Sequence, residues 1–130
     1  MATNSHYRTD RQCVEGLGTA HEGVGHWWGQ RVTAIALVPL TLLFVFPLAR
    51  NLGSDWEAVR PSYANPFNVI VAALLLIVAF RHLQYGILVV VEDYIHHKPL
   101  KTGLLLANIA VCWVLGLTGV YAVARLAFSA

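Results

Sequence analysis

Residues 67–96, FNVIVAALLLIVAFRHLQYGILVVVEDYIH, determine the fold of this chain. The part from 67 to 91 has no acidic side chain, and its only basic side chains are Arg81 and His82. As a helix rising 1.5 Å per residue, it is long enough to cross about 30 Å of hydrocarbon. The stretch therefore predicts a transmembrane helix with acidic residues at its C-terminal end.

Composition points to the same class. Hydrophobic residues make up 57% of the 130 residues and charged residues only 12%, with a mean hydropathy of +0.58, which is unlike a soluble protein. Two further charge-free stretches, 32–49 and 104–124, are also long enough to span a membrane. We predict an all-α membrane protein with three transmembrane helices at about 32–49, 67–91 and 104–126.

The remaining residues are too few for a soluble catalytic domain. We expect an N-terminal tail, 1–31, and a transmembrane domain, 32–130, with a loop over 50–66 broken by Gly53, Pro61 and Pro66 and a short link around 97–101. Since the tail has no apolar run typical of a cleavable signal peptide, the first span is expected to act as an uncleaved insertion signal. Its two prolines, Pro39 and Pro47, should bend or end that helix.

The basic residues predict the topology. Five fall on one side of a three-span chain and three on the other: Arg8, Arg11, Arg31, Lys98 and Lys101 against Arg50, Arg60 and Arg125. This bias favours a cytoplasmic or matrix N-terminus. The net charge of +2 then reflects topology and not nucleic-acid binding. With no Arg- and Ser-rich transit segment ahead of the first span, we expect a bacterial inner (plasma) membrane and not a mitochondrial one.

His82 is the first candidate site residue. It lies roughly 15 Å from the end of its helix, near the middle of the bilayer, where a histidine serves as an interhelical hydrogen-bonding group, a proton relay or a metal ligand. Gly86 follows one turn later on nearly the same face, where it would admit a flat macrocycle or simply a neighbouring helix. No other histidine shares this depth. A haem with two histidine ligands would therefore need its second ligand from another chain.

Three polar residues, Glu92, Asp93 and Tyr94, lie where this helix leaves the membrane. A phenol donates a hydrogen bond to a carbonyl oxygen, and a neighbouring carboxylate supplies protons, as a two-electron, two-proton reduction of a quinone requires. The alternative is an interfacial tyrosine beside solvated acids.

These residues form two motifs. One is His82, Gly86, Glu92, Asp93 and Tyr94, and the other is His26, Trp27, Trp28, Gln30, Arg31, Thr33 and Ala34 at the mouth of the first span. Together with the three-helix layout they resemble the family of hydrophobic membrane-anchor subunits of succinate dehydrogenase, respiratory complex II. The resemblance covers most of the chain, and the spacing from the histidine to the Asp-Tyr pair is its most specific part.

The resemblance implies roles for five residues. His82 would be an axial ligand of the iron of haem b, and Tyr94 and Asp93 would belong to the ubiquinone site. Arg31 would meet the haem propionates, with His26 as a further candidate for that contact. For Arg31 the alternative is a residue that only sets the topology.

The resemblance also implies partners. The haem would be shared with a second anchor, the cytochrome b anchor subunit, while FAD and iron-sulfur clusters would lie in the flavoprotein subunit and the iron-sulfur subunit. The chain would be packed with the cytochrome b anchor subunit and surrounded by lipid, and alone it would be a non-catalytic subunit. Two alternatives stay open: an anchor of a fumarate reductase, and a cofactor-free structural membrane protein. Arg81 lies deep in its span, and the sequence offers no partner for it within this chain.

Overall fold

The computed structural model describes residues 9–14 and 24–128, and these contain only helices, turns and links. The helices are α1 (Asp10–Val14), α2 (Val24–Asn51), α3 (Trp56–Ala64), α4 (Pro66–Tyr94) and α5 (Lys98–Phe128). Three of them, α2, α4 and α5, are long and apolar enough to cross a membrane. The predicted all-α fold with three transmembrane helices is confirmed.

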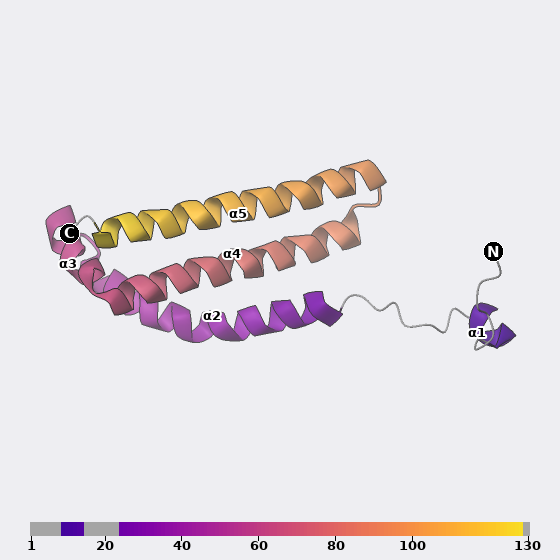
Figure 1. Ribbon diagram of the computed structural model, residues 1–130, viewed down its shortest axis with the longest axis horizontal. Helices are drawn as coiled ribbons and strands as arrows, with labels where there is room; N and C mark the ends of the chain where they lie inside the picture. Colours follow the sequence, from indigo (N-terminus) through magenta and orange to yellow (C-terminus); the bar gives the residue numbers. More distant parts are fainter. Residues whose placement is uncertain (1–8, 15–23, 129–130) are drawn as a thin grey trace.

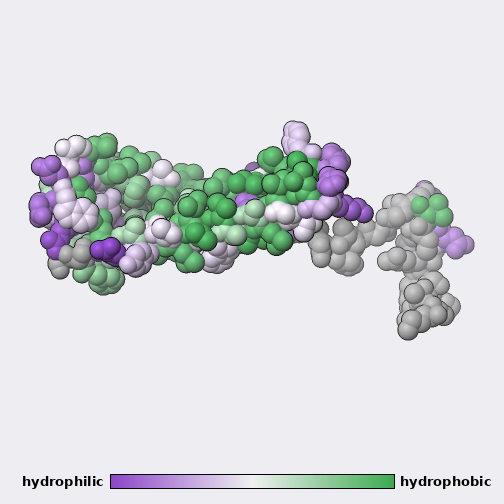
Figure 2. Space-filling view, turned by 90° about the horizontal axis from the view of Figure 1, so that it is seen from above, coloured by the Kyte–Doolittle hydropathy of each residue, from purple (hydrophilic) through white to green (hydrophobic). Residues whose placement is uncertain are grey.

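Helix α4 lies between the other two long helices (Figure 1). Both α2 and α5 pack against α4, and within the described residues they make no contact with each other. The short helix α3 covers one end of this layer. The space-filling view shows an apolar band along the long helices with polar residues at both ends (Figure 2). The central helix α4 thus contacts both of the other long helices.

The layer has almost no core of its own. Among the described residues no large side chain is fully buried, and the buried hydrophobic ones are limited to Tyr63, Val71, Ala72, Val91 and Cys112. A layer whose apolar side chains are mostly exposed is stable only when lipid or other helices cover it. The packing of this chain with a second anchor subunit remains a prediction.

The first long helix differs from its prediction at both ends. It begins at Val24 and not at 32, because the aromatic and polar residues before the apolar span continue the same helix. It also continues through Pro39 and Pro47 to Asn51, whose side-chain amide donates to the Pro47 carbonyl at 2.7 Å. The two prolines were expected to bend or end this helix, and the structure shows that neither of them ends it.

The predicted loop over 50–66 is largely helical. Only Gly53 takes a left-handed conformation, with φ of 79°, and Pro61 lies inside α3. Pro66 is the first residue of α4, where the Asn65 side chain accepts a hydrogen bond from the Phe67 amide at 3.0 Å. Proline is favoured at this position because the amide it lacks has no helical partner there.

The link between the last two helices is also shorter than predicted, because α5 already begins at Lys98 with Pro99 in its first turn. The N-terminal ends of α2 and α5 and the C-terminal end of α4 lie at the same end of the layer (Figure 1). Lys98 and Lys101 therefore share an end with the start of α2. The structure places Arg50 at the opposite end, beside α3, as the charge count assumed.

Glycines of α5 permit close packing on α4. A Cβ at Gly116 would lie 3.5 Å from the Phe80 side chain, and one at Gly119 would lie 3.1 Å from Leu76. Small residues at such positions let transmembrane helices approach closely. Gly103, in contrast, has no atom within 4 Å of its Cβ position and does not contribute to this contact.

Candidate functional site

The middle of α4 carries His82, and the structure connects it to α2. Its Nδ1 lies 3.0 Å from the hydroxyl oxygen of Thr33, and both side chains are half-buried. The other ring nitrogen, Nε2, makes no hydrogen bond with the residues that the structure describes. One nitrogen of this imidazole is thus held by α2, and the second is available to a ligand.

A polar stripe on α2 faces α4. His26, Gln30 and Thr33 recur at the i, i+4, i+7 spacing that places side chains on one face of a helix. The His26 ring meets the Tyr85 ring edge-on, with centroids 6.1 Å apart. Gln30 lies next to Gly86, and its buried Oε1 has no hydrogen-bond partner among the described residues. This orphaned oxygen lies one helical turn from His82, at the level of Gly86.

Gly29 allows the two helices to meet at this level. A Cβ at Gly29 would lie 2.8 Å from ring atoms of Tyr85 and 2.9 Å from its hydroxyl oxygen, so any larger residue there would have to displace the tyrosine side chain or the helix. The tyrosine ring therefore rests directly on the α2 backbone.

The same tyrosine is a partner of Arg81. The guanidinium donates to the Tyr85 hydroxyl at 2.6 Å and to Gln84 Oε1 at 2.8 Å, and its Cζ lies 4.7 Å from the tyrosine ring centroid. The sequence offered no partner for Arg81 within this chain, whereas the structure gives it two neutral ones on the next turn of α4. Within the described residues no carboxylate pairs with this cation.

Polar side chains also join α4 to α5. The buried Asn108 amide donates to the Gln84 backbone carbonyl at 2.9 Å, and Cys112 Sγ donates to Asn108 Oδ1 at 3.4 Å.

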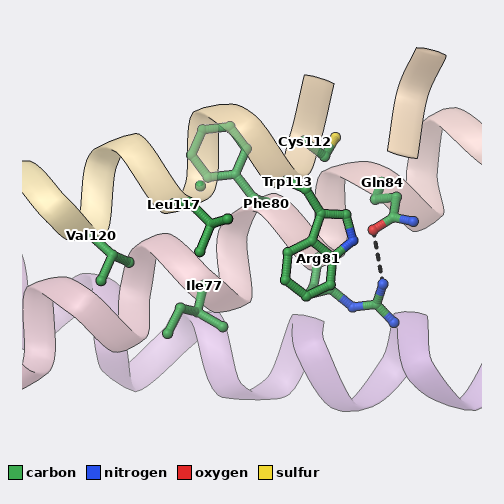
Figure 3. Close-up of a pocket in the computed structure, with 9 residues that line it drawn as sticks. Ile77, Phe80, Arg81, Gln84, Cys112, Trp113, Leu117 and Val120 are labelled. Atoms are coloured by element: carbon green, nitrogen blue, oxygen red, sulfur yellow. Dashed lines mark hydrogen bonds between the residues drawn. The ribbon is translucent and has the colours of Figure 1, made fainter. Parts of the chain in front are cut away.

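Beside this network a half-open pocket of about 530 Å³ lies between the two helices, with Arg81 and Trp113 at one end (Figure 3). The pocket is lined mostly by apolar side chains, which is typical of a space filled by lipid or by another helix.

The predicted quinone residues lie elsewhere. Tyr94 is the last residue of α4 and is 76% exposed, and Asp93 is also exposed. They are separated from His82 by roughly 18 Å along the helix axis. The structure therefore keeps the candidate haem ligand and the candidate quinone residues at two separate depths.

Arg31 is exposed and lies along its own helix, with its Cζ 5.6 Å from the Trp27 ring centroid. Trp27 in turn stacks on Trp28 at 5.5 Å. At 100° per residue, Arg31 lies about 160° around α2 from Thr33, whereas His26 shares the face of Thr33. The two candidates for propionate contacts are thus not brought together on one side of α2.

The fit of a haem to these residues can be judged from their chemistry. Within the described residues there is no group of three or more His, Cys, Asp or Glu side chains arranged for a metal ion. A haem iron needs only an axial ligand from the protein, and a neutral imidazole with a free Nε2 suits that role. Gly86, one turn along α4, adds no side chain on that face. These features fit a haem held by His82.

Sequence reasoning missed several of these contacts. Thr33 was noted only as part of a motif, and Gln84, Tyr85 and Asn108 were not singled out. Two signals in the sequence could have identified three of these residues. The polar stripe on α2 indicated Thr33, and the spacing of three and four residues from Arg81 indicated Gln84 and Tyr85.

Comparison with known proteins agrees with the family resemblance. The family model of the succinate dehydrogenase/fumarate reductase transmembrane subunit matches residues 5–120. A succinate dehydrogenase hydrophobic membrane anchor subunit of Paracoccus denitrificans is 35% identical over 124 residues, which is 95% of each chain. The protein of the same name from Rickettsia bellii is 32% identical over 78% of this chain and 81% of its own length.

A succinate dehydrogenase membrane anchor subunit of Reclinomonas americana is 31% identical over 61% of this chain and 68% of its own. No solved structure matches the chain. The resemblance drawn from the motifs is confirmed, and the chain belongs to the family of succinate dehydrogenase/fumarate reductase transmembrane subunits.

Proposed function

We propose that this chain anchors a succinate:quinone oxidoreductase in the membrane, helps to bind haem b and forms part of the site where ubiquinone is reduced. The observation that carries the proposal is the depth of His82 in its helix together with the hydrogen bonding of its two ring nitrogens. It lies near the middle of a membrane-spanning helix, with Nδ1 bonded to Thr33 and Nε2 without a partner among the described residues. An ionisable side chain at such depth is expensive and is retained for function.

His82 would hold the haem through Nε2, and the second axial histidine would come from the cytochrome b anchor subunit. A bound haem supplies a one-electron carrier between the two anchor subunits. The contribution of this chain is to hold the imidazole in place from α2, and Gly86 adds no side chain one turn along α4.

His26 and Arg31 would donate to the haem propionates. An imidazole and a guanidinium near the membrane boundary suit carboxylates, and a guanidinium binds them with two hydrogen bonds. Because the two residues lie on different sides of α2, they would not bind the same propionate together. Each would act on its own.

Tyr94 and Asp93 would act on the quinone. The phenol of Tyr94 would donate a hydrogen bond to a quinone carbonyl, and the carboxylate of Asp93 would take up protons from water and supply them to the same pocket as the quinone is reduced. Both side chains are exposed at the end of α4 and would complete this site with the iron-sulfur subunit.

Succinate would be oxidised at FAD in the flavoprotein subunit, and electrons would reach the quinone through iron-sulfur clusters. The charge bias supports a cytoplasmic N-terminus, and the relatives from Paracoccus denitrificans and Rickettsia bellii support a bacterial inner membrane. Fumarate reductase anchors belong to the same family, and the names of the relatives favour succinate dehydrogenase.

The test is to purify the tagged chain with its partners in mild detergent and to record the visible spectrum before and after adding succinate. Bleaching of a flavin together with a b-type haem signal is the expected result. A chain that purifies with neither flavin nor haem would contradict the proposal and would favour a cofactor-free structural membrane protein.

A further inference from the structure

The surroundings of the Thr33 hydroxyl indicate a direction for its hydrogen bond with the candidate haem ligand. Besides His82 Nδ1 at 3.0 Å, the Thr33 hydroxyl oxygen lies 2.8 Å from the Gly29 carbonyl and 3.1 Å from the Gln30 carbonyl. A hydroxyl has one proton to donate and two lone pairs. Carbonyl oxygens only accept, so the Thr33 proton belongs to the nearer of these carbonyls and the imidazole is the donor to Thr33.

The opposite direction would exclude metal ligation. If Thr33 donated to Nδ1, the proton of the neutral imidazole would lie on Nε2. A protonated Nε2 has no lone pair to offer to a metal. With the proton on Nδ1, Nε2 instead carries a lone pair, which is the form that ligates a metal.

We infer that Thr33 is a positioning residue for the axial ligand: its hydroxyl accepts the Nδ1 proton of His82, fixes the tautomer and ring orientation, and so presents Nε2 to the haem iron. This inference rests on the proposed haem ligation by His82. Metal-bound histidines commonly donate their other ring proton to a neighbouring acceptor, which makes the ligand more basic. A more basic ligand favours ferric iron, so the Thr33 contact lowers the midpoint potential of the haem.

The local packing supports this role. Thr33 follows Gly29 by one helical turn, and the ring of Tyr85 rests on Gly29. The α2 backbone is therefore held against α4 within one turn of the Thr33–His82 contact. The hydroxyl that accepts the imidazole proton is also held by its own hydrogen bond to the Gly29 carbonyl.

The experiment compares Thr33→Val, Thr33→Ser and the control Thr41→Val in the purified complex. Valine keeps the shape of threonine without the hydroxyl, serine keeps the hydroxyl, and Thr41 is exposed on the same helix. The readouts are the midpoint potential of the haem, its low-spin electron paramagnetic resonance spectrum and the rate of haem loss.

Thr33→Val is expected to raise the potential, to change the resonance spectrum and to speed haem loss roughly 10-fold or more. Thr33→Ser and Thr41→Val should both behave like the parent. If the valine variant does not assemble, Thr33→Ala, which adds no bulk, gives the same comparison.

An unchanged potential and resonance spectrum in the variants without the hydroxyl would overturn the inference. His82→Ala separates this failure from that of the proposed function. If His82→Ala loses the haem while Thr33→Val is unchanged, only the positioning role is wrong. If His82→Ala keeps a haem with an unaltered bis-histidine spectrum, the ligand assignment itself is wrong.

Discussion

The ring of Tyr85 occupies the space that a side chain at Gly29 would need, since a Cβ there would lie 2.8 Å from the ring. This contact brings α2 and α4 together one turn from the Thr33–His82 hydrogen bond. The spacing of the two helices at the candidate haem site is therefore set by a glycine and an aromatic ring.

Gly29→Ala should weaken the complex. The added methyl group must displace the Tyr85 ring or separate the helices, and such overpacking typically costs about 1–3 kcal/mol. Gly25→Ala is the control, because no atom lies within 4 Å of its Cβ position and alanine is the better helix former. Thermal inactivation and haem content of the purified complex measure the effect. Equal stability of the two variants would show that the contact does not hold the helices together.

Tyr94→Phe should impair ubiquinone reduction and leave succinate oxidation by an artificial soluble acceptor intact. The hydroxyl makes no hydrogen bond within the described residues, so its loss should not disturb the chain itself. One hydrogen bond to the reacting carbonyl is worth about 1.5 kcal/mol, or roughly tenfold in rate. Tyr121→Phe, an exposed tyrosine on α5, is the control. A parallel fall of both activities would point to assembly and not to quinone binding.

Asn108→Leu should loosen α5 from α4. The substitution keeps the approximate shape of the side chain and removes the amide that donates to the Gln84 carbonyl. Interhelical hydrogen bonds in membranes contribute about 0.6 kcal/mol on average and up to about 1.7. Thr118→Val is the control, because that hydroxyl bonds only to its own helix. Unfolding in mixed micelles measures the difference, and an unchanged Asn108→Leu protein would contradict this role.

Hydrophobicity predicted the number and type of the long helices, because a membrane span has to exceed a fixed apolar length. It did not predict the bounds of these helices. Both α2, which begins at Val24, and α5, which begins at Lys98, start outside the apolar stretches. A helix continues past the hydrocarbon wherever the sequence still favours helix. Pro61 was misread for a related reason, because hydrophobicity says nothing about short interfacial helices such as α3.

The candidate site was predictable only in part. His82 was identified because a titratable group in an apolar helix is unusual, and Tyr94 because of its position at the helix end. The Thr33 contact and the Arg81 partners depend on how two helices are rotated and aligned, which local periodicity does not determine. The exposure of Tyr94 likewise becomes visible only when the ends of the helices are known.

Ligation of haem by His82 is the central claim, and the reduced-minus-oxidised visible spectrum of the complex carrying His82→Ala tests it most directly. His96→Ala, an exposed histidine in the link after α4, serves as the control. We predict that His82→Ala loses the b-type haem signal or changes it to that of a haem with one histidine ligand, while His96→Ala keeps it. A His82→Ala complex with an unaltered bis-histidine b-type spectrum would contradict haem ligation by His82.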